Sequence, residues 1–334
     1  MGITAKELAK KLGLSEAAVS IALNHKPGVS TATKQRVLEA AEKYGYDFTR
    51  VSTKRGGNGS IFMVIYKKHG AVVGDSPFFS ELIDSIQKAC KEEGYPFNTR
   101  YLYEEDDVSA QIEDLVYSAC SGIILLGTEM RREDFRPFES IRIPLVLLDV
   151  YFDSVKRDCV LINNVQGAFL ATDYLIRHTK KQPGYLRSYY SISNFEERAD
   201  GFYNAIRQHG YSASKSVVHK LSPSIEGAYS DMLEIIDSGE ALAPCYFADN
   251  DMIALGAMKA LQQRGYSIPK DISIIGFDNI SHCNYASPSL TTVNVPKTYM
   301  GETAVHRLVE IMKAKSFVPV KIEVMMNLVK RQSV

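Results

Sequence analysis

Three aspartates stand at points of the sequence where a polar side chain could do chemistry. Asp149, Asp249 and Asp278 each follow directly after an apolar run. Asp149 and Asp278 could serve an enzyme as general acid and base, or they could accept hydrogen bonds from a polar ligand. The sequence contains no G-x-S-x-G elbow, Walker loop, G-x-G-x-x-G turn or paired-histidine metal motif to complete an enzymatic site. We therefore expect a ligand-binding protein that is not an enzyme and uses neither a cofactor nor a metal.

The cysteines and the apolar runs indicate the compartment. The five cysteines are odd in number, widely scattered and free of any C-x-x-C pair. This pattern favours buried thiols in a reducing cytoplasm over disulfides or a zinc site. No apolar stretch approaches the length of a membrane span, and the N-terminus shows no apolar stretch typical of a secretory signal. We expect a cytoplasmic protein without a membrane partner.

From residue 60 onward, apolar strands alternate with amphipathic helices. "SIFMVIY" is followed by "FFSELIDSIQKACKEEGY", and the alternation continues to "SLTTVNV" at 289–295. Continuous apolar strands between helices predict parallel sheets that are covered on both faces. The series is too long for one small sheet, so we expect an α/β body of two doubly wound lobes. Ligands of such lobes bind at the carboxyl ends of strands, where the three aspartates lie.

The first fifty residues predict three short helices. Thr4 and Glu7 form a capping-box pattern, Gly13 can end the first helix, and Ser15 and Ser30 can cap the next two. The inward-facing residues of the third helix are predicted to be Val37, Leu38, Ala41 and Tyr44. Two helices joined by a glycine turn and followed by a third are typical of the helix-turn-helix DNA-binding motif.

A glycine-rich linker and a shift in charge separate this head from the body. "STKRGGNGS" at 52–60 has three glycines in four positions and resists fixed structure. Residues 1–57 hold ten basic against five acidic residues, whereas the remainder holds 29 basic against 34 acidic residues. The asymmetry suits a basic head that binds nucleic acid on an acidic body, although a solvated charged helix would show the same excess.

Seven short motifs, in this order and spacing, resemble the LacI/GalR family of bacterial transcriptional regulators over essentially the whole chain. They are "AKELAKKLGLSEAAVSIALN" at 5, "GVSTATKQRVLEAAEKYGY" at 28, "NNVQGA" at 163, "ERADGF" at 197, "NDMIALGA" at 250, "GFDN" at 276 and "PSLTTV" at 288. The resemblance implies a homodimeric repressor of a pseudo-palindromic, double-stranded operator, with a body like periplasmic sugar-binding proteins. A small effector between the lobes would change operator affinity. A periplasmic binding protein would share the body but carry a signal peptide in place of the basic head.

The resemblance also implies domain boundaries. Residues 1–48 would form the helix-turn-helix domain, 49–59 the hinge or linker, and 60–334 the effector-binding and dimerisation body. Within that body, the lobe nearer the DNA would comprise 60–160 and 294–320. The distal lobe would comprise 161–293 and 321–334, so that the chain would pass between the lobes three times.

The family's DNA contacts fall on polar residues of the head. The positions that match its backbone-contacting residues are Thr4, Ser15, Ser20, Asn24, Ser30, Thr33 and Tyr46. Helix capping alone would also explain Thr4, Ser15 and Ser30. The positions that match its base-reading residues are Glu16, Ala17 and Ile21, with His25 and Lys26 as supplementary contacts. A glutamate can accept from cytosine and an alanine can touch a thymine methyl, so we expect modest direct readout and an unusual operator.

The hinge departs from the family, because Arg55 stands where a groove-wedging leucine is expected. Arg50, Lys54 and Arg55 could instead place positive charge in a narrow minor groove. A disordered basic linker is the alternative.

Six residues match the family's effector contacts. They are Phe78, Phe79, Asp149, Arg198, Asn250 and Asp278. A carboxylate, a guanidinium and an amide over an aromatic face suit a sugar or sugar derivative, which is the effector that we expect first. A nucleobase also fits Phe78 and Phe79 and is the second expectation. The two phenylalanines could equally belong to the core, and Asn164, where the family usually has Asp, receives no ligand role.

Overall fold

The computed structural model describes residues 3–23, 28–46, 59–74, 76–118, 120–314 and 316–334. Its first three helices are α1 (Ala5–Leu12), α2 (Glu16–Leu23) and α3 (Thr31–Lys43), as the sequence predicts. They enclose a small core in which Leu8, Val19 and Val37 are fully buried. α1 ends at Gly13, whose φ of 65° is a left-handed conformation that glycine adopts without steric cost.

One residue of the third helical segment is placed differently from the prediction. Tyr44 was expected to face inward, but it is 40% exposed. The ammonium group of Lys11 lies 4.0 Å from the centre of its ring, so a cation–π contact at the surface replaces burial. The other three predicted residues are buried or half-buried.

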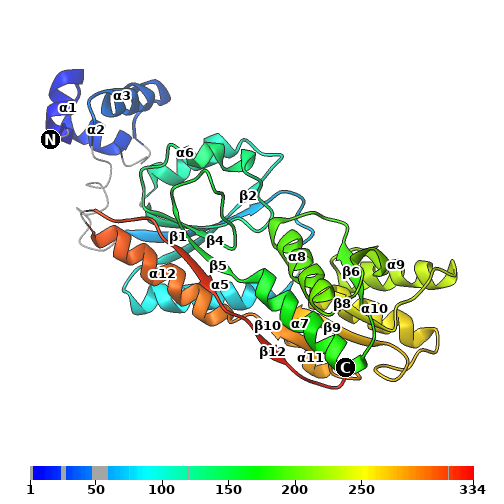
Figure 1. The fold of residues 1–334 in the computed structure, drawn as a ribbon. Helices are drawn as coiled ribbons and strands as arrows, with labels where there is room; N and C mark the ends of the chain where they lie inside the picture. The colour runs from blue at the N-terminus through cyan, green and yellow to red at the C-terminus, as the bar shows by residue number, and fades with distance from the viewer. Residues whose placement is uncertain (1–2, 24–27, 47–58, 75, 119, 315) are drawn as a thin grey trace.

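The first lobe is built on a six-stranded sheet with the strand order β11-β5-β4-β3-β1-β2. Figure 1 labels four of these strands, β1, β2, β4 and β5, together with helices α5, α6 and α12 of the same lobe. Its strands are β1 (Ser60–Lys67), β2 (Phe97–Tyr103), β3 (Cys120–Leu126), β4 (Leu145–Leu148), β5 (Asp158–Ile162) and β11 (Lys321–Val324), and every neighbouring pair is parallel. Its helical elements are α5 (Pro77–Glu92), α6 (Val108–Tyr117), η1 (Glu133–Phe138) and α12 (Lys297–Lys313).

The second lobe repeats this plan with the strand order β12-β10-β9-β8-β6-β7. Its strands are β6 (Gly184–Ser188), β7 (Val218–Leu221), β8 (Cys245–Ala248), β9 (Ser273–Asp278), β10 (Thr291–Asn294) and β12 (Asn327–Val329); only β12 pairs antiparallel, with β10. Its helical elements are α7 (Asn164–Thr179), α8 (Ser193–Gln208), η2 (Ala213–Lys215), α9 (Ile225–Asp237), α10 (Asp251–Gln263) and α11 (His282–Tyr285). The predicted fold class, a helical head and two parallel-sheet lobes, is confirmed.

Burial on both faces of the sheet explains the continuous apolar strands. In β1, Ile61 and Met63 join one core cluster, whereas Val64 and Tyr66 join another. Successive side chains of a strand point to opposite faces, so a strand between two helical layers must be apolar at almost every position. Within the described residues, no helix is both long and apolar enough to cross a membrane.

The chain passes between the two sheets three times: from β5 to α7, from β10 to α12, and from β11 to β12. We expected residues 321–334 to join the distal lobe, and this is wrong for 321–324. Lys321–Val324 pair with Cys159–Ile162 in the first sheet, and the chain crosses only after Val324. β5 likewise extends the first sheet two residues beyond the expected limit of 160. Both strands are short, and neither "DCVLI" nor the mixed "KIEV" carries a signal that assigns it to one sheet rather than the other.

Helices α7 and α8 approach closely at Gly201. A Cβ atom at this position would lie 2.2 Å from the carbonyl oxygen of Val165 and 2.9 Å from Cβ of Ala168. Such distances are shorter than van der Waals contact, so the two helices pack at this separation only with a hydrogen in place of a side chain.

Replacing Gly201 with Ala should therefore force α8 away from α7. We expect the free energy of unfolding in urea to fall by about 2 kcal/mol, because overpacking outweighs the better helix propensity of alanine. Asn204→Ala, at an exposed position of the same helix, is the control and should change it by less than about 0.5 kcal/mol. Equal stability of the two variants would show that the helices separate without cost.

Candidate functional site

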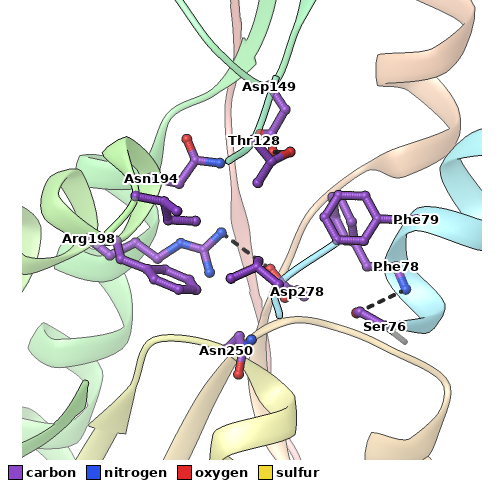
Figure 2. Close-up of a pocket in the computed structure, with 12 residues that line it drawn as sticks. Ser76, Phe78, Phe79, Thr128, Asp149, Asn194, Arg198, Asn250 and Asp278 are labelled. Atoms are coloured by element: carbon purple, nitrogen blue, oxygen red, sulfur yellow. Dashed lines mark hydrogen bonds and ion pairs between the residues drawn. The ribbon is translucent and has the colours of Figure 1, made fainter. Parts of the chain in front are cut away.

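A cavity lies between the two lobes, at the carboxyl ends of strands from both sheets. From the first lobe it is lined by Val72, Ser76, Phe78, Phe79, Thr128 and Asp149, and from the second by Ile192, Asn194, Phe195, Arg198, Asn250 and Asp278. The labelled side chains converge from opposite sides in Figure 2. All six residues that the sequence predicts to contact the effector thus line one cavity. Their role in binding remains a prediction.

Little free space remains in this cavity, because the lobes touch around it. Val72 of the first lobe packs against Ile192 and Phe195 of the second. The ring of His69 lies against that of Tyr190, tilted by 31°, with 4.2 Å between the centroids. The remaining volume is about 20 Å³, which is enough for about one water molecule. A sugar ring or a base would enter only if the lobes separated or the side chains moved.

Arg198 is held in place by four partners in the distal lobe. Its Nε donates to Oδ1 of Asn164 at 2.9 Å, and its Nη1 donates to the carbonyl oxygen of Asp249. Its Nη2 lies 3.4 Å from Oδ1 of Asp278. The guanidinium also lies 3.7 Å from the ring centre of Phe277, in a cation–π contact. These contacts fix its position before any ligand binds.

Both cavity aspartates hold protons more strongly than an exposed carboxyl group. Burial raises the pKa of Asp278 to about 7, although the charge of Arg198 opposes the shift. Burial likewise raises the pKa of Asp149 to about 6, against the hydrogen bond that it accepts from Thr128 at 2.7 Å. Their ionisation therefore changes near neutral pH, where an ordinary aspartate is always charged.

The remaining predicted residues have structural roles that are compatible with ligand contact. Asn250 caps α10, because its Oδ1 accepts from the backbone N–H of Ile253 at 2.9 Å. Its amide group remains available as a donor. Phe78 and Phe79 meet edge to face with 5.0 Å between the ring centroids, and both are less than 10% exposed. The expectation that they could be core residues therefore also holds, since they line the cavity from within the core.

Several residues of the site were not predicted from the sequence. Thr128 and Asn194 line the cavity from opposite lobes, and Figure 2 shows Asn194 reaching toward Thr128 and Asp149. Asn164 received no role, yet it is 2% exposed and accepts the hydrogen bond of Arg198 while donating to Glu197 at 2.9 Å. Its place at the start of α7 was visible in the sequence, but its partner lies 34 residues away.

Asp249 serves the structure of the distal lobe. It accepts from the hydroxyl of Tyr185 and from the backbone N–H of Ser188, the latter at 2.7 Å. These bonds join the end of β8 to β6, and the side chain does not line the cavity. Among the residues that the structure describes, no three histidine, cysteine or acidic side chains gather as metal ligands would.

In the head, three predicted DNA contacts begin helices. Thr4 and Glu7 form the capping box, Oγ of Ser15 accepts from Ala18 N–H at 3.1 Å, and Oγ of Ser30 accepts from Thr33 N–H at 3.1 Å. All three residues thus cap helices, which is the alternative role. Their contact with DNA remains a prediction.

The other predicted contacts of the head are partly exposed or lie outside the described residues. Glu16, Ala17 and Ser20 are exposed on α2, whereas Thr33 and Tyr46 are half-buried. Oε1 of Glu16 lies 3.9 Å from Nζ of Lys6. The side chain of Glu16 is 65% exposed and that of Lys6 is 81% exposed. The predicted contacts that fall outside the described residues are Asn24, His25, Lys26, Arg50, Lys54 and Arg55.

Known proteins resemble both parts of this architecture. Residues 4–47 match the model of bacterial regulatory proteins of the lacI family, and residues 172–334 match that of periplasmic binding protein-like domains. The HTH-type transcriptional repressor PurR of Pasteurella multocida (strain Pm70) is 30% identical over 337 residues, covering 99% of this chain and 98% of that protein.

Solved structures share the fold over the whole chain. The transcriptional regulator CelR in complex with cellobiose superposes with a TM-score of 0.73 at 21% identity, covering 99% of this chain and all of that one. A lac repressor dimer bound to operator and the anti-inducer ONPF superposes with a TM-score of 0.72 at 20% identity, covering all of this chain and 99% of that one. Taken together with the full-length similarity to PurR, the head and the two lobes show that this chain belongs to the lacI family of bacterial regulatory proteins, as a DNA-binding transcriptional repressor.

Proposed function

We propose that an uncharged sugar, bound between the two lobes, controls this repressor. The charge balance of the cavity carries the proposal: Asp149 and Asp278 supply two carboxyl groups against the single guanidinium of Arg198. A phosphorylated or carboxylated ligand would meet net repulsion there once both aspartates are ionised. Sugar hydroxyls, by contrast, donate to carboxylates and accept from a guanidinium.

The apolar part of the cavity suits a ring. Phe78, Phe79 and Phe195 line it, and aromatic faces pack against the C–H face of a pyranose as well as against a flat base. A nucleobase is therefore the second candidate, with ring N–H groups donating to Asp278. The sugar is preferred because the polar lining includes Ser76, Thr128, Asn194 and Asn250 in addition to the charged groups, which matches a ligand with hydroxyls on every edge.

The mechanism that we propose is a change in lobe separation. The cavity accommodates about one water molecule with the lobes in contact, so effector entry and lobe movement are coupled. In a homodimer, movement of the first lobes would change the spacing of the two heads and hence the fit to a pseudo-palindromic operator. A shift in occupancy from 99:1 to 1:99 requires that the effector prefer one state by roughly 5.5 kcal/mol.

We propose that the head makes the contacts with DNA. The helix starts at Thr4, Ser15 and Ser30 present backbone N–H groups that suit phosphate oxygens. The further contacts in this proposal are Glu16, Ala17, Ser20, Asn24, His25, Thr33, Tyr46, Arg50, Lys54 and Arg55. The proposal includes a head at 1–48, a linker at 49–59 and a body at 60–334, acting as a homodimer in the cytoplasm. The lac repressor of similar fold is a dimer on its operator.

Replacing Arg198 with Ala should abolish the response to effector and spare operator binding. Because the side chain occupies the cavity and lies in the body, we expect sugar affinity to fall by roughly 30-fold or more. The measurement is a gel-shift titration of DNA upstream of the regulated gene, with and without a panel of uncharged sugars, sugar phosphates and nucleobases. Arg177→Ala, at an exposed arginine of α7, is the matched control and should respond as the parent protein does. A normal response of the Arg198 variant would refute the assigned site.

Sugar affinity should also depend on pH in a defined direction. The pKa values of Asp278 and Asp149, about 7 and about 6, are raised above that of an exposed aspartate, so both groups take up protons as the pH falls from about 8 to about 5. Since the ionised form accepts hydroxyl protons more strongly, binding should weaken over this range by roughly tenfold or more. Isothermal titration calorimetry across the range measures this change, and Asp278→Asn should flatten it. Constant affinity of the parent protein from pH 5 to pH 8 would contradict the assigned carboxylates.

A further inference from the structure

Lys297 is a buried lysine at the passage from β10 to α12, and it contacts residues that line the cavity. It is 7% exposed, and its ammonium group has three oxygen partners from two lobes. In the distal lobe, Nζ donates to the carbonyl oxygens of Asp278 at 3.0 Å and Asn279 at 3.1 Å. In the first lobe, it lies 3.2 Å from Oε2 of Glu81 on α5. The three hydrogens of the ammonium group thus match three acceptors.

The turn that Lys297 contacts has an unfavourable backbone conformation. Asp278 and Asn279 have φ values of 112° and 54°, a region that residues with side chains rarely adopt. Both carbonyl oxygens of this turn converge on Nζ, so the lysine compensates for the strained backbone. Asp278 is also the carboxyl group that meets Arg198 in the cavity. The lysine therefore fixes the backbone from which a proposed effector contact projects.

The other end of the contact is part of a closely packed pair of helices in the first lobe, α5 and α12. At Gly301 of α12, a Cβ atom would lie 1.9 Å from Oγ of Ser85 on α5, which shows how closely the two helices pack. Oγ of Ser85 in turn lies within 3.5 Å of the carbonyl oxygen of Lys297. α5 supplies Phe78 and Phe79 to the cavity, and Nζ of Lys297 lies 5.6 Å from the ring centre of Phe78.

We propose that Lys297 is a positioning residue that links the two walls of the cavity: it holds the Asp278–Asn279 turn of the distal lobe against helix α5 of the first lobe. Any rotation of one lobe on the other stretches or breaks these contacts. The lysine thus sets the balance between contacting and separated lobes, and it carries a shift of the Asp278 turn to the first lobe. Its role in the response to effector rests on the proposed function, whereas its role in lobe separation does not.

The test measures lobe separation without effector or DNA. All five native cysteines are buried, so fluorescent dyes can be attached to Glu105→Cys in the first lobe and Glu226→Cys in the distal lobe, both at exposed positions. Labelled subunits are mixed with a large excess of unlabelled subunits, so that energy transfer is recorded within one chain. Single-molecule transfer efficiency then reports the fractions with contacting and with separated lobes.

Lys297→Met keeps the length of the side chain and removes its charge, and we expect the fraction with separated lobes to rise at least about tenfold. Glu81→Gln removes only the ion pair with a side chain that is 45% exposed, and should raise it by about twofold to fivefold. Lys313→Met is the matched control: Lys313 lies on the same helix and pairs with Glu93, 3.4 Å away, without touching the distal lobe. It should leave the distribution unchanged.

Thermal unfolding of each variant separates positioning from general stability. A lysine with a merely structural role would lower the melting temperature and leave the transfer efficiencies of the folded molecules in place. That result, or equal distributions for Lys297→Met, Glu81→Gln and Lys313→Met, would overturn the proposal. Should Lys297→Met fail to fold, Glu81→Gln decides: a shifted distribution supports the link and an unshifted one refutes it. A shifted distribution with an unchanged response to effector would instead count against the proposed function and leave the link between the lobes standing.

Discussion

The geometry of the cavity depends on how one buried guanidinium is held. Arg198 is 4% exposed, and a charge so far from water is stable only with several partners. Those partners come from the start of α7, the end of β8 and the end of β9. A single side chain therefore fixes three elements of the distal lobe relative to one another. It also leaves Asp278 close to a positive charge, while burial raises the pKa of that carboxyl group to about 7. The side chains of the site are therefore held in place, and the charge of Asp278 changes near neutral pH.

The lobes are held together by the ring pair of His69 and Tyr190 and by two further sets of contacts, one of which shares Asp278 with the guanidinium. Val72, Ile192 and Phe195 form an apolar contact, and Lys297 provides a polar one between the Asp278 turn and α5. Because these contacts are few and the free volume is small, separating the lobes costs only the loss of local contacts and leaves each core intact. A ligand that alters them can change the relation of the lobes without unfolding either, which is the property that a switch requires.

The sequence was informative where local patterns decide structure, and less so where distant segments meet. Continuous apolar strands, the capping box at Thr4 and the glycine at position 13 predicted the lobes and the head, since each rests on near neighbours in the chain. Family motifs brought Arg198 and Asp278 to one cavity. Asn164 and Lys297 were not predictable, because an asparagine opening a helix and a lysine beginning another have ordinary surface roles until the fold buries them. The final crossing was predicted wrongly for the same reason: Lys321–Val324 join their sheet by pairing with β5, 162 residues earlier in the chain.

The central claim is that the cavity and the operator are energetically coupled, and thermodynamic reciprocity tests it most directly. Calorimetry measures the affinity of full-length protein for a bound sugar, first without DNA and then with saturating operator. If the two sites share one conformational equilibrium, the operator must change sugar affinity by the same factor by which the sugar changes operator affinity. We predict equal factors that differ from one. A sugar affinity that is identical with and without operator would contradict the account.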